Sequence, residues 1–346
     1  MKRIELGRSG IDVPNWCLGT MTWGRQTPED DGHRQIDMAL DHGIDFLDTA
    51  EMYPVNPARA ETVGATETII GNWIRRTGRR DELTIATKML GPSEMVRDGA
   101  PITPDHLREA LDGSLTRLGT DCVDLYQFHW PNRGSYHFRQ NWTYNPTGQD
   151  PAEVSDNIDA VMDALKDLQS QGKIRAFGLS NDSAWGVARW CQAAEAQGGP
   201  RVSTIQNEYS LLCRLFDTDL AEACHHEGVT LLAYSPLACG LLSGKYQGGD
   251  IPEGSRRSIN DGLNGRVGPR CDAAIEAYLE IARRHGLDPV RMAFAWVTTR
   301  PVPSIPIFGA TTTEQMEHAM AGLDTTIPEE ALDEIEAAHR ANPMPF

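Results

Sequence analysis

GIDFLDTA, residues 43–50, is a short apolar run that begins after a glycine and carries a carboxylate near its carboxyl end. LTIATK (83–88) and VDLYQFH (123–129) have the same form, with a lysine and a histidine as their last residues. Short β-rich runs of this kind are typical of strands buried on both faces of a parallel sheet. The three runs therefore predict both strands and the place where polar groups gather.

Similar runs recur along the chain and alternate with segments of helical period. We expect eight strands, near residues 16–22, 43–50, 83–88, 123–129, 174–180, 203–209, 230–236 and 304–309. Helices are predicted between them, because apolar residues recur every three or four positions and start and stop signals flank them. Clear examples open at Thr27 and Thr103 and end at Gly43 and Gly119, and a third ends at Gly172.

Strands that alternate with amphipathic helices pair in parallel through right-handed crossovers, and eight such units close a (β/α)8 TIM barrel. We expect one such domain over residues 1–346. The alternative is an open doubly wound sheet. It is less favoured because the first strand–helix turn, GTMTWGRQTPED (19–30), lacks the GxGxxG pattern of dinucleotide-binding sheets.

The composition excludes several classes of function. The formal net charge of −17, without a run of basic residues, argues against nucleic-acid binding. Seven scattered cysteines without a CxxC pair predict neither a disulfide framework nor a zinc site. The first residues, MKRIELGRSG, have no signal-peptide pattern, and no apolar run is long enough to span a membrane. A cytoplasmic location is expected.

The segment 130–152 has no helical or strand period and is rich in aromatic residues. A long loop in a compact domain is usually functional or disordered, and its aromatic content argues against disorder. Because it directly follows the predicted strand 123–129, we expect it to overhang the mouth of the barrel.

In barrel enzymes the active site lies where the strands end. Asp48, Lys88 and His129 satisfy that rule, and Tyr53 follows shortly after the strand that carries Asp48. A phenol has a pKa of about 10, and a neighbouring Lys88 ammonium is expected to lower it. Asp48 would keep that ammonium charged, and His129 would orient a carbonyl oxygen or share in proton delivery.

Each of these residues also has a purely structural interpretation. Alone, Asp48 would be a helix cap, Lys88 a solvated cation, Tyr53 a packing residue and His129 a satisfied core imidazole. Four such groups converging on one face of a barrel favour a catalytic site that transfers a proton to a carbonyl oxygen.

Other strand ends carry groups suited to a dinucleotide. Ser180 and Asn181 suit a carboxamide, Gln206 lies on the sixth predicted strand, and Tyr234 is placed to stack on a flat ring. The segment 309–313, GATTT, leads into a helix whose free N–H groups favour phosphate, although serine and threonine there are also ordinary helix caps. No Cys or His cluster predicts a metal.

Eight blocks of the sequence are informative in combination: LGRSGIDVPNWCLGTMTWG (6–24), GIDFLDTAEMY (43–53), TKML (87–90), DLYQFHWP (124–131), GLSND (178–182), IQNEYSLL (205–212), YSPLACGLLSGKY (234–246) and FGATTTEQM (308–316). Taken together they resemble the aldo-keto reductase superfamily, and the likeness spans essentially the whole chain. Within it, the arrangement of IQNEYSLLCR (205–214), LLAYSPLACGLLSGKY (231–246) and IARRHGLDP (281–289) is similar to the bacterial Tas-like branch, which is related to potassium-channel β-subunits.

The resemblance implies a (β/α)8 barrel with a short N-terminal hairpin and long loops at its carboxyl-terminal face. It implies an NADPH-dependent reduction of aldehydes or ketones by direct hydride transfer. The catalytic tetrad would be Asp48, Tyr53, Lys88 and His129, with Tyr53 as general acid. The implied cofactor residues are Thr20, Met21, Gln26, Asp48, Ser180, Asn181, Gln206, Tyr234, Ser235, Pro236, Leu237, Gly240, Lys245, Arg256, Gly309, Thr311 and Gln315.

Two departures from the branch concern the adenosine end of the cofactor. The branch often has Glu-Asn where this chain reads Gln315 to Ala319, which includes His318. In the preceding loop, either Arg256 or Arg257 is a candidate for the 2′-phosphate. A basic pair in an acidic chain favours a phosphate over a plain ribose, so NADP is preferred to NAD.

Three functions are compared. The first is an NADPH-dependent carbonyl reductase, and the second is a redox-sensing NADP(H)-binding regulatory subunit with slow chemistry. The third, a cofactor-independent lyase or glycosidase, needs a second carboxylate beside Asp48, for which only Glu208 stands at a strand end.

The substrate pocket is expected to be apolar. Trp23 and Trp130, with Tyr53 and His129, would form its wall around a small carbonyl compound. Aromatic residues of the long loop are equally suited to a subunit contact, so a homo-oligomer is an open alternative.

Overall fold

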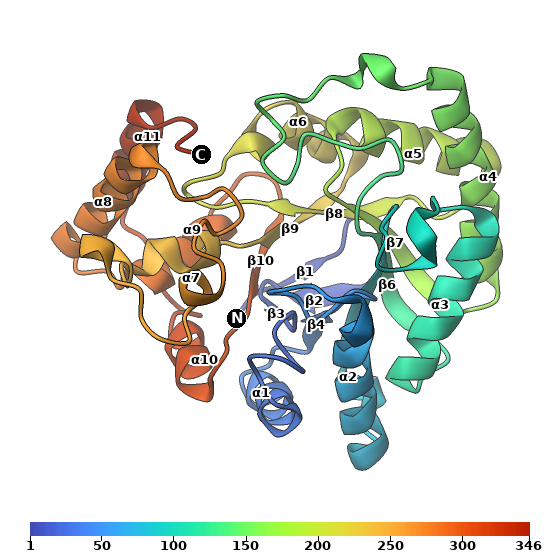
Figure 1. The fold of residues 1–346 in the computed structure, drawn as a ribbon, viewed down its shortest axis with the longest axis horizontal. Coiled ribbons are helices and arrows are strands. Elements are labelled where there is room, and N and C mark those ends of the chain that lie inside the picture. The colour runs from blue at the N-terminus through green and yellow to red at the C-terminus, as the bar shows by residue number, and fades with distance from the viewer.

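The computed structural model describes residues 1–346, in which eight parallel strands close into a barrel in the order β10-β3-β4-β5-β6-β7-β8-β9 (Figure 1). The barrel strands are β3 (Cys17–Gly19), β4 (Phe46–Asp48), β5 (Thr84–Met89), β6 (Val123–Phe128), β7 (Ile174–Ser180), β8 (Val202–Glu208), β9 (Thr230–Tyr234) and β10 (Ser304–Phe308). The predicted (β/α)8 fold is confirmed, and each expected run overlaps one of these strands, although β5 ends one residue later and β8 begins one residue earlier than expected.

Helices surround the barrel on its outside, as Figure 1 shows. They are α1 (Glu29–Asp41), α2 (Ala65–Thr77), α3 (Pro104–Leu118), α4 (Pro151–Ser170), α5 (Ala184–Gln197), α6 (Asp219–Glu227), α7 (Arg256–Ile259), α8 (Pro269–Arg284), α9 (Pro289–Thr298), α10 (Thr313–Met320) and α11 (Glu329–Ala341). Their apolar faces and the outer faces of the strands form a core cluster of 74 buried residues. No helix is long and apolar enough to cross a membrane.

The helix signals in the sequence place most ends correctly. Thr103 caps α3 by accepting a hydrogen bond from the backbone N–H of His106, and Gly119 ends the helix in the left-handed conformation. Thr27 differs from the expectation. Its hydroxyl contacts that of Thr22 at 2.9 Å, and α1 begins after Pro28 without a side-chain cap.

A short antiparallel hairpin closes the amino-terminal end of the barrel. β1 (Arg3–Glu5) pairs with β2 (Asp12–Pro14), and the backbone N–H of Gly7 donates to the hydroxyl of Thr230 at the start of β9. Leu6 and Val13 are fully buried in a second cluster of 11 residues, which fills the barrel interior. The hairpin therefore seals this end with apolar side chains.

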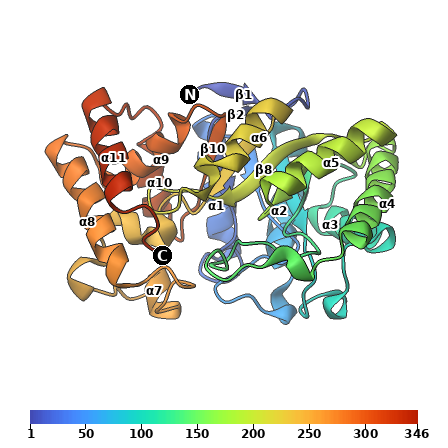
Figure 2. The same ribbon diagram turned by 90° about the horizontal axis from the view of Figure 1, so that it is seen from above.

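The long loops lie at the opposite end. In Figure 2 the hairpin is at the top and the segment after β6 runs along the bottom, near α7. This arrangement follows from parallel pairing, because every strand ends on the same side of the barrel. The predicted position of segment 130–152 over the mouth is confirmed: Trp130 and Phe138 line a cavity there, and α4 begins at Pro151.

Gly71 tests the packing of α2 against α3. A Cβ at this position would lie 2.1 Å from the backbone oxygen of Arg117, closer than any real contact. Gly71→Ala should therefore lower the free energy of unfolding by about 1–3 kcal/mol, although alanine is the better helix former. Urea unfolding followed by circular dichroism measures the change.

Gly148→Ala is the matched control, because nothing lies within 4 Å of its added methyl group. Equal unfolding midpoints for wild type and Gly71→Ala would contradict the close helix contact.

Candidate active site

A cavity of about 1290 Å³ opens at the carboxyl ends of the strands. Of the tetrad, the implied cofactor residues and the expected substrate-wall residues, Lys88 and Trp23 are not part of its wall. The others line it: Thr20, Met21, Gln26, Asp48, Tyr53, His129, Trp130, Ser180, Asn181, Gln206, Tyr234, Ser235, Pro236, Leu237, Gly240, Lys245, Arg256, Gly309, Thr311 and Gln315.

Strand alternation brings the acid and the ammonium into the barrel interior. Phe46 on β4 and Ala86 on β5 belong to the apolar cluster inside the barrel. Asp48 and Lys88 each stand two residues further on, so their side chains point to the same interior face. They form a polar layer between that apolar cluster and the carboxyl-terminal face of the barrel.

Lys88 is the centre of the site. Its fully buried ammonium donates to the Oδ2 of Asp48 at 2.8 Å and to the backbone oxygen of Thr49 at 2.7 Å. The phenol oxygen of Tyr53 lies 3.5 Å from the same nitrogen. The ring of His129 meets that of Tyr53 edge to face, with 5.8 Å between the centroids. The structure thus brings all four residues together.

The second oxygen of the Asp48 carboxylate is also satisfied. Gln206 donates to Oδ1 through Nε2 at 2.7 Å, and Gln127 does so at 3.4 Å. Gln127 is a site residue that sequence reasoning did not single out. The signal for it was the alternation along β6, because Gln127 stands two residues before His129 and so faces the same side.

Burial and charge shift the ionisation of Lys88 and His129. Burial lowers the pKa of Lys88, and the Asp48 carboxylate opposes this shift by stabilising the ammonium, as expected. Burial also lowers the pKa of His129 well below its ordinary value, and the positive charge of Lys88 adds to that effect. The imidazole of His129 is therefore neutral at pH 7. Its Nδ1 is buried without a hydrogen-bond partner in the protein.

The expected lowering of the Tyr53 pKa is wrong for this structure. Burial raises the pKa of Tyr53 well above its usual value, and the Asp48 carboxylate raises it further, while Arg256 opposes both. The physical reason is that loss of water around the phenolate and its repulsion by the Asp48 carboxylate outweigh the attraction of Arg256. Tyr53 is a protonated phenol, which is the form that can donate.

Ser180, Asn181 and Tyr234 form a hydrogen-bonded group beside the tetrad. Asn181 accepts from the Tyr234 hydroxyl at 2.7 Å and donates through Nδ2 to the backbone oxygen of His129 at 2.9 Å. The Ser180 hydroxyl donates to the backbone oxygen of Gln206 at 2.7 Å. These contacts link the ends of β6, β7, β8 and β9 and hold the amide groups at the cavity wall.

Arg25, Lys245 and Arg256 bring positive charge to the cavity wall, and none of the three forms an ion pair with a carboxylate. Arg256 instead contacts the Cys239 sulfur at 3.6 Å. Arg257 does not line the cavity and lies 3.7 Å from Asp261. Of the two candidates for a phosphate, the structure therefore leaves Arg256 available.

The residues after β10 that were expected near the adenosine end of the cofactor lie only partly at the cavity. Gln315 accepts from the Thr311 backbone N–H and hydroxyl at 3.2 and 3.0 Å, at the start of α10. His318 and Ala319 are not part of the cavity wall, and His318 is paired with Asp288 at 2.8 Å.

The two predicted tryptophans have different positions. Trp130 lines the cavity, and its ring lies 5.1 Å from that of His129 and 6.0 Å from that of Phe138. Trp23 is fully buried away from the cavity, where its indole N–H donates to Gln35 at 3.0 Å, so its expected place in the substrate wall is wrong. Phe138, half exposed in the loop after β6, takes that place instead.

Glu208, the only other strand-end carboxylate considered, does not face Asp48 across the cavity. Its side chain is held by Arg139 and by Arg266, the latter at 2.7 Å. No group of three or more His, Cys, Asp or Glu side chains is arranged to hold a metal ion.

Comparisons with known proteins agree with this geometry. The aldo/keto reductase family model matches residues 15–340. Protein tas of Escherichia coli is 43% identical over all of this chain and 99% of its own length. The uncharacterized oxidoreductase YrpG of Bacillus subtilis is 31% identical and covers 96% of this chain and 94% of its own length.

A more distant relative carries a cofactor in its name. Aldo-keto reductase yakc [NADP(+)] of Schizosaccharomyces pombe is 29% identical over 93% of this chain and 86% of its own length. The resemblance expected from the sequence is confirmed, and with a matching family model over nearly the whole chain, this protein belongs to the aldo/keto reductase family.

Proposed function

We propose that this protein reduces an aldehyde or ketone to an alcohol with NADPH, and that Tyr53 is the general acid. Family membership makes it an oxidoreductase. The observation that supports the finer proposal is the chain of contacts from Asp48 through Lys88 to Tyr53, in which the phenol oxygen is 3.5 Å from the ammonium. A protonated acid and a cation beside it are what carbonyl reduction needs.

The residues of the tetrad have separate tasks in this proposal. Tyr53 donates its proton to the carbonyl oxygen as negative charge develops there. The Lys88 ammonium then stabilises the phenolate, because it is close by and buried, where charge interactions are strong. Asp48 holds the ammonium in its charged form. His129, neutral and edge-on to Tyr53, orients the carbonyl oxygen with a ring N–H.

The wall of the cavity suits a dinucleotide. Its volume of about 1290 Å³ exceeds the range of about 300–1,000 Å³ typical of pockets for single small ligands. Ser180, Asn181 and Gln206 would hold the carboxamide, and Tyr234 would stack on the ring. When bound, NADPH supplies the hydride for the carbonyl carbon.

Three observations support NADP over NAD. Lys245 and Arg256 are cations without carboxylate partners, and such groups suit the additional phosphate. The helix α10 begins directly after the cavity residue Thr312, so its N–H groups add positive potential there. The name of the Schizosaccharomyces pombe relative includes NADP(+).

The substrate side of the cavity favours an apolar carbonyl compound. Trp130 and Phe138 meet edge to face, and Met52 and Val55 add aliphatic surface. Arg139, which also lines this region, is ion-paired with Glu208. The same ion pairs argue against glycosidase chemistry, since Glu208 is not free to act with Asp48.

Tyr53→Phe tests the role of the phenol. The variant should keep its affinity for NADPH and lose about 10²–10⁴-fold in kcat, because only the proton donor is removed. NADPH binding is followed by the change in protein fluorescence, and turnover by NADPH oxidation with a panel of aldehydes and ketones.

Wild-type protein should turn over many equivalents of NADPH in that assay. A single equivalent would favour the alternative of a redox-sensing subunit, and unchanged turnover in Tyr53→Phe would remove this residue from the mechanism.

Arg256→Met tests the cofactor preference. Loss of the guanidinium should raise the Kd for NADPH about tenfold to a hundredfold, as expected for a hydrogen-bonded charge pair. The Kd for NADH should change little. Arg257→Met is the matched control, because that arginine lies next in sequence but outside the cavity. An equal loss of NADPH affinity in both variants would contradict the assignment to Arg256.

A further inference from the structure

Glu208 ends β8 and connects two loops that come from distant parts of the chain. Its carboxylate, 5% exposed, accepts through Oε2 from Arg139 and through Oε1 from Arg266 at 2.7 Å. Arg139 belongs to the segment 130–150, named here the aromatic loop. Arg266 belongs to the segment 235–268, named here the cationic loop. One carboxylate therefore holds both.

The two loops form different parts of the cavity wall. The aromatic loop contributes Trp130 and Phe138, which flank the tetrad, and the cationic loop contributes Lys245 and Arg256. Glu208 itself does not line this cavity. It lies behind the wall, in a second cavity of about 20 Å³ that Arg139 also lines. Glu208 thus contacts the cavity wall through its two arginine partners.

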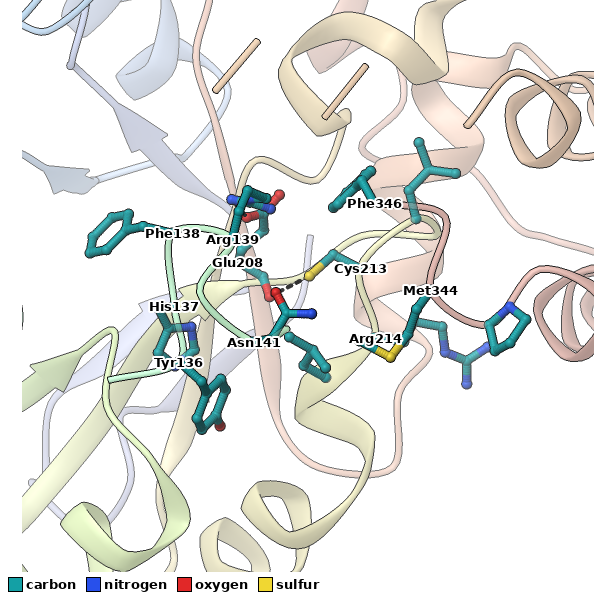
Figure 3. A pocket seen from close by; sticks show the side chains of 13 residues that line it. Tyr136, His137, Phe138, Arg139, Asn141, Glu208, Cys213, Arg214, Met344 and Phe346 are labelled. Carbon is teal, nitrogen blue, oxygen red and sulfur yellow. Dashed lines mark hydrogen bonds and ion pairs between the residues drawn. The ribbon is translucent and has the colours of Figure 1, made fainter. Parts of the chain in front are cut away.

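Further contacts join the loops around Glu208. A Cβ on Gly265 would lie 2.9 Å from Cγ of Arg139, so the two loops touch. The guanidinium carbon of Arg139 also stands 5.3 Å from the ring centre of Phe346. Figure 3 shows Arg139 beside Glu208, with Phe346 on its other side.

Both loops carry backbone strain next to the ion pairs. Phe138 and Arg139 have φ angles of 57° and 68°, and Leu263 and Asn264 have φ angles of 45° and 56°. Such conformations are unfavourable for residues other than glycine and persist only where surrounding contacts hold them. The arginine contacts with Glu208 are the nearest candidates for that restraint.

Opposite charges strengthen the contacts between Glu208 and the two arginines. Burial alone raises the pKa of Glu208, but the guanidiniums of Arg266 and Arg139 outweigh it, and the net shift is a lowered pKa. The carboxylate is therefore ionised at pH 7. Without it, the buried guanidinium of Arg266 and the partly buried one of Arg139 would face each other unpaired, and the loops would separate.

We propose that Glu208 is a positioning residue that couples the two loops, so that a phosphate-bearing ligand on the cationic loop also sets the position of Phe138 on the aromatic loop. The proposal rests on the proposed function, since it assigns the cofactor to one loop and the carbonyl substrate to the other. Ligand binding that restrains Arg266 in the cationic loop would, through Glu208, also restrain Arg139 in the aromatic loop. By linkage, the coupling acts equally in the reverse direction.

Glu208→Gln tests the coupling in the holoenzyme. It keeps the size of the side chain and removes the charge. The Kd for NADPH and the KM for an apolar ketone should both rise by about fivefold or more, while kcat changes by less than about threefold, because the tetrad is untouched. A merely structural role would lower the yield of active enzyme and leave both constants unchanged.

Asp124→Asn is the matched control. Asp124 is also buried and also held by two arginines, Arg80 at 2.9 Å and Arg175 at 2.6 Å, but it lies at the start of β6, at the opposite end of the barrel. This variant should lose stability without a change in Kd or KM. Equal changes of Kd and KM in both variants would overturn the proposal.

Hydrogen exchange in cofactor-free protein separates this proposal from the proposed function. Arg139→Met should speed amide exchange in residues 255–268 of the cationic loop, although Arg139 is in the other loop. In the Glu208→Gln background, the same substitution should have no further effect. Unchanged exchange in Arg139→Met would overturn the coupling even if NADPH is turned over. Absence of NADPH binding in the wild type would instead overturn the proposed function, and the exchange measurement would still decide whether Glu208 links the loops.

Discussion

The burial of one ammonium group determines how the rest of the site is built. Lys88 has no exposed surface, and a charge in such a place is stable only with a counter-charge and further hydrogen bonds. Asp48 provides the counter-charge, and Gln206 and Gln127 satisfy the other carboxylate oxygen. The polar layer above the apolar barrel interior is thus a requirement of stability, and the same layer supplies a cation next to the Tyr53 phenol.

Charge is distributed unevenly between the whole chain and its cavity. The chain has a formal net charge of −17, yet the cavity wall holds Arg25, Lys245 and Arg256 without carboxylate partners. The Glu208 carboxylate near the mouth is instead engaged with two arginines. An anionic ligand is therefore repelled by the average surface and attracted at the cavity, which favours entry by one route.

Much of this arrangement was predictable from the sequence, because strand periodicity is a local property. The strand ends carrying Asp48, Lys88 and His129 were identifiable, and parallel pairing brings such ends together. Trp23 was misplaced because a tryptophan in a loop next to a strand end can turn either inward or outward, and its bond to Gln35 decides this. The raised pKa of Tyr53 and the link from Glu208 to Arg139 depend on distances between remote segments, which no local pattern contains.

The hairpin of β1 and β2 has a consequence for the supply of protons. Leu6, Ile11 and Val13 close the amino-terminal end of the barrel and pack against its apolar interior. This packing closes the path for water to the tetrad from that end. The barrel is therefore open only at its carboxyl-terminal end, where the cavity lies. In the proposed mechanism, the proton that Tyr53 donates would be replaced through the same opening that admits the ligands. On that proposal, each catalytic cycle would be reset from the carboxyl-terminal side of the barrel only.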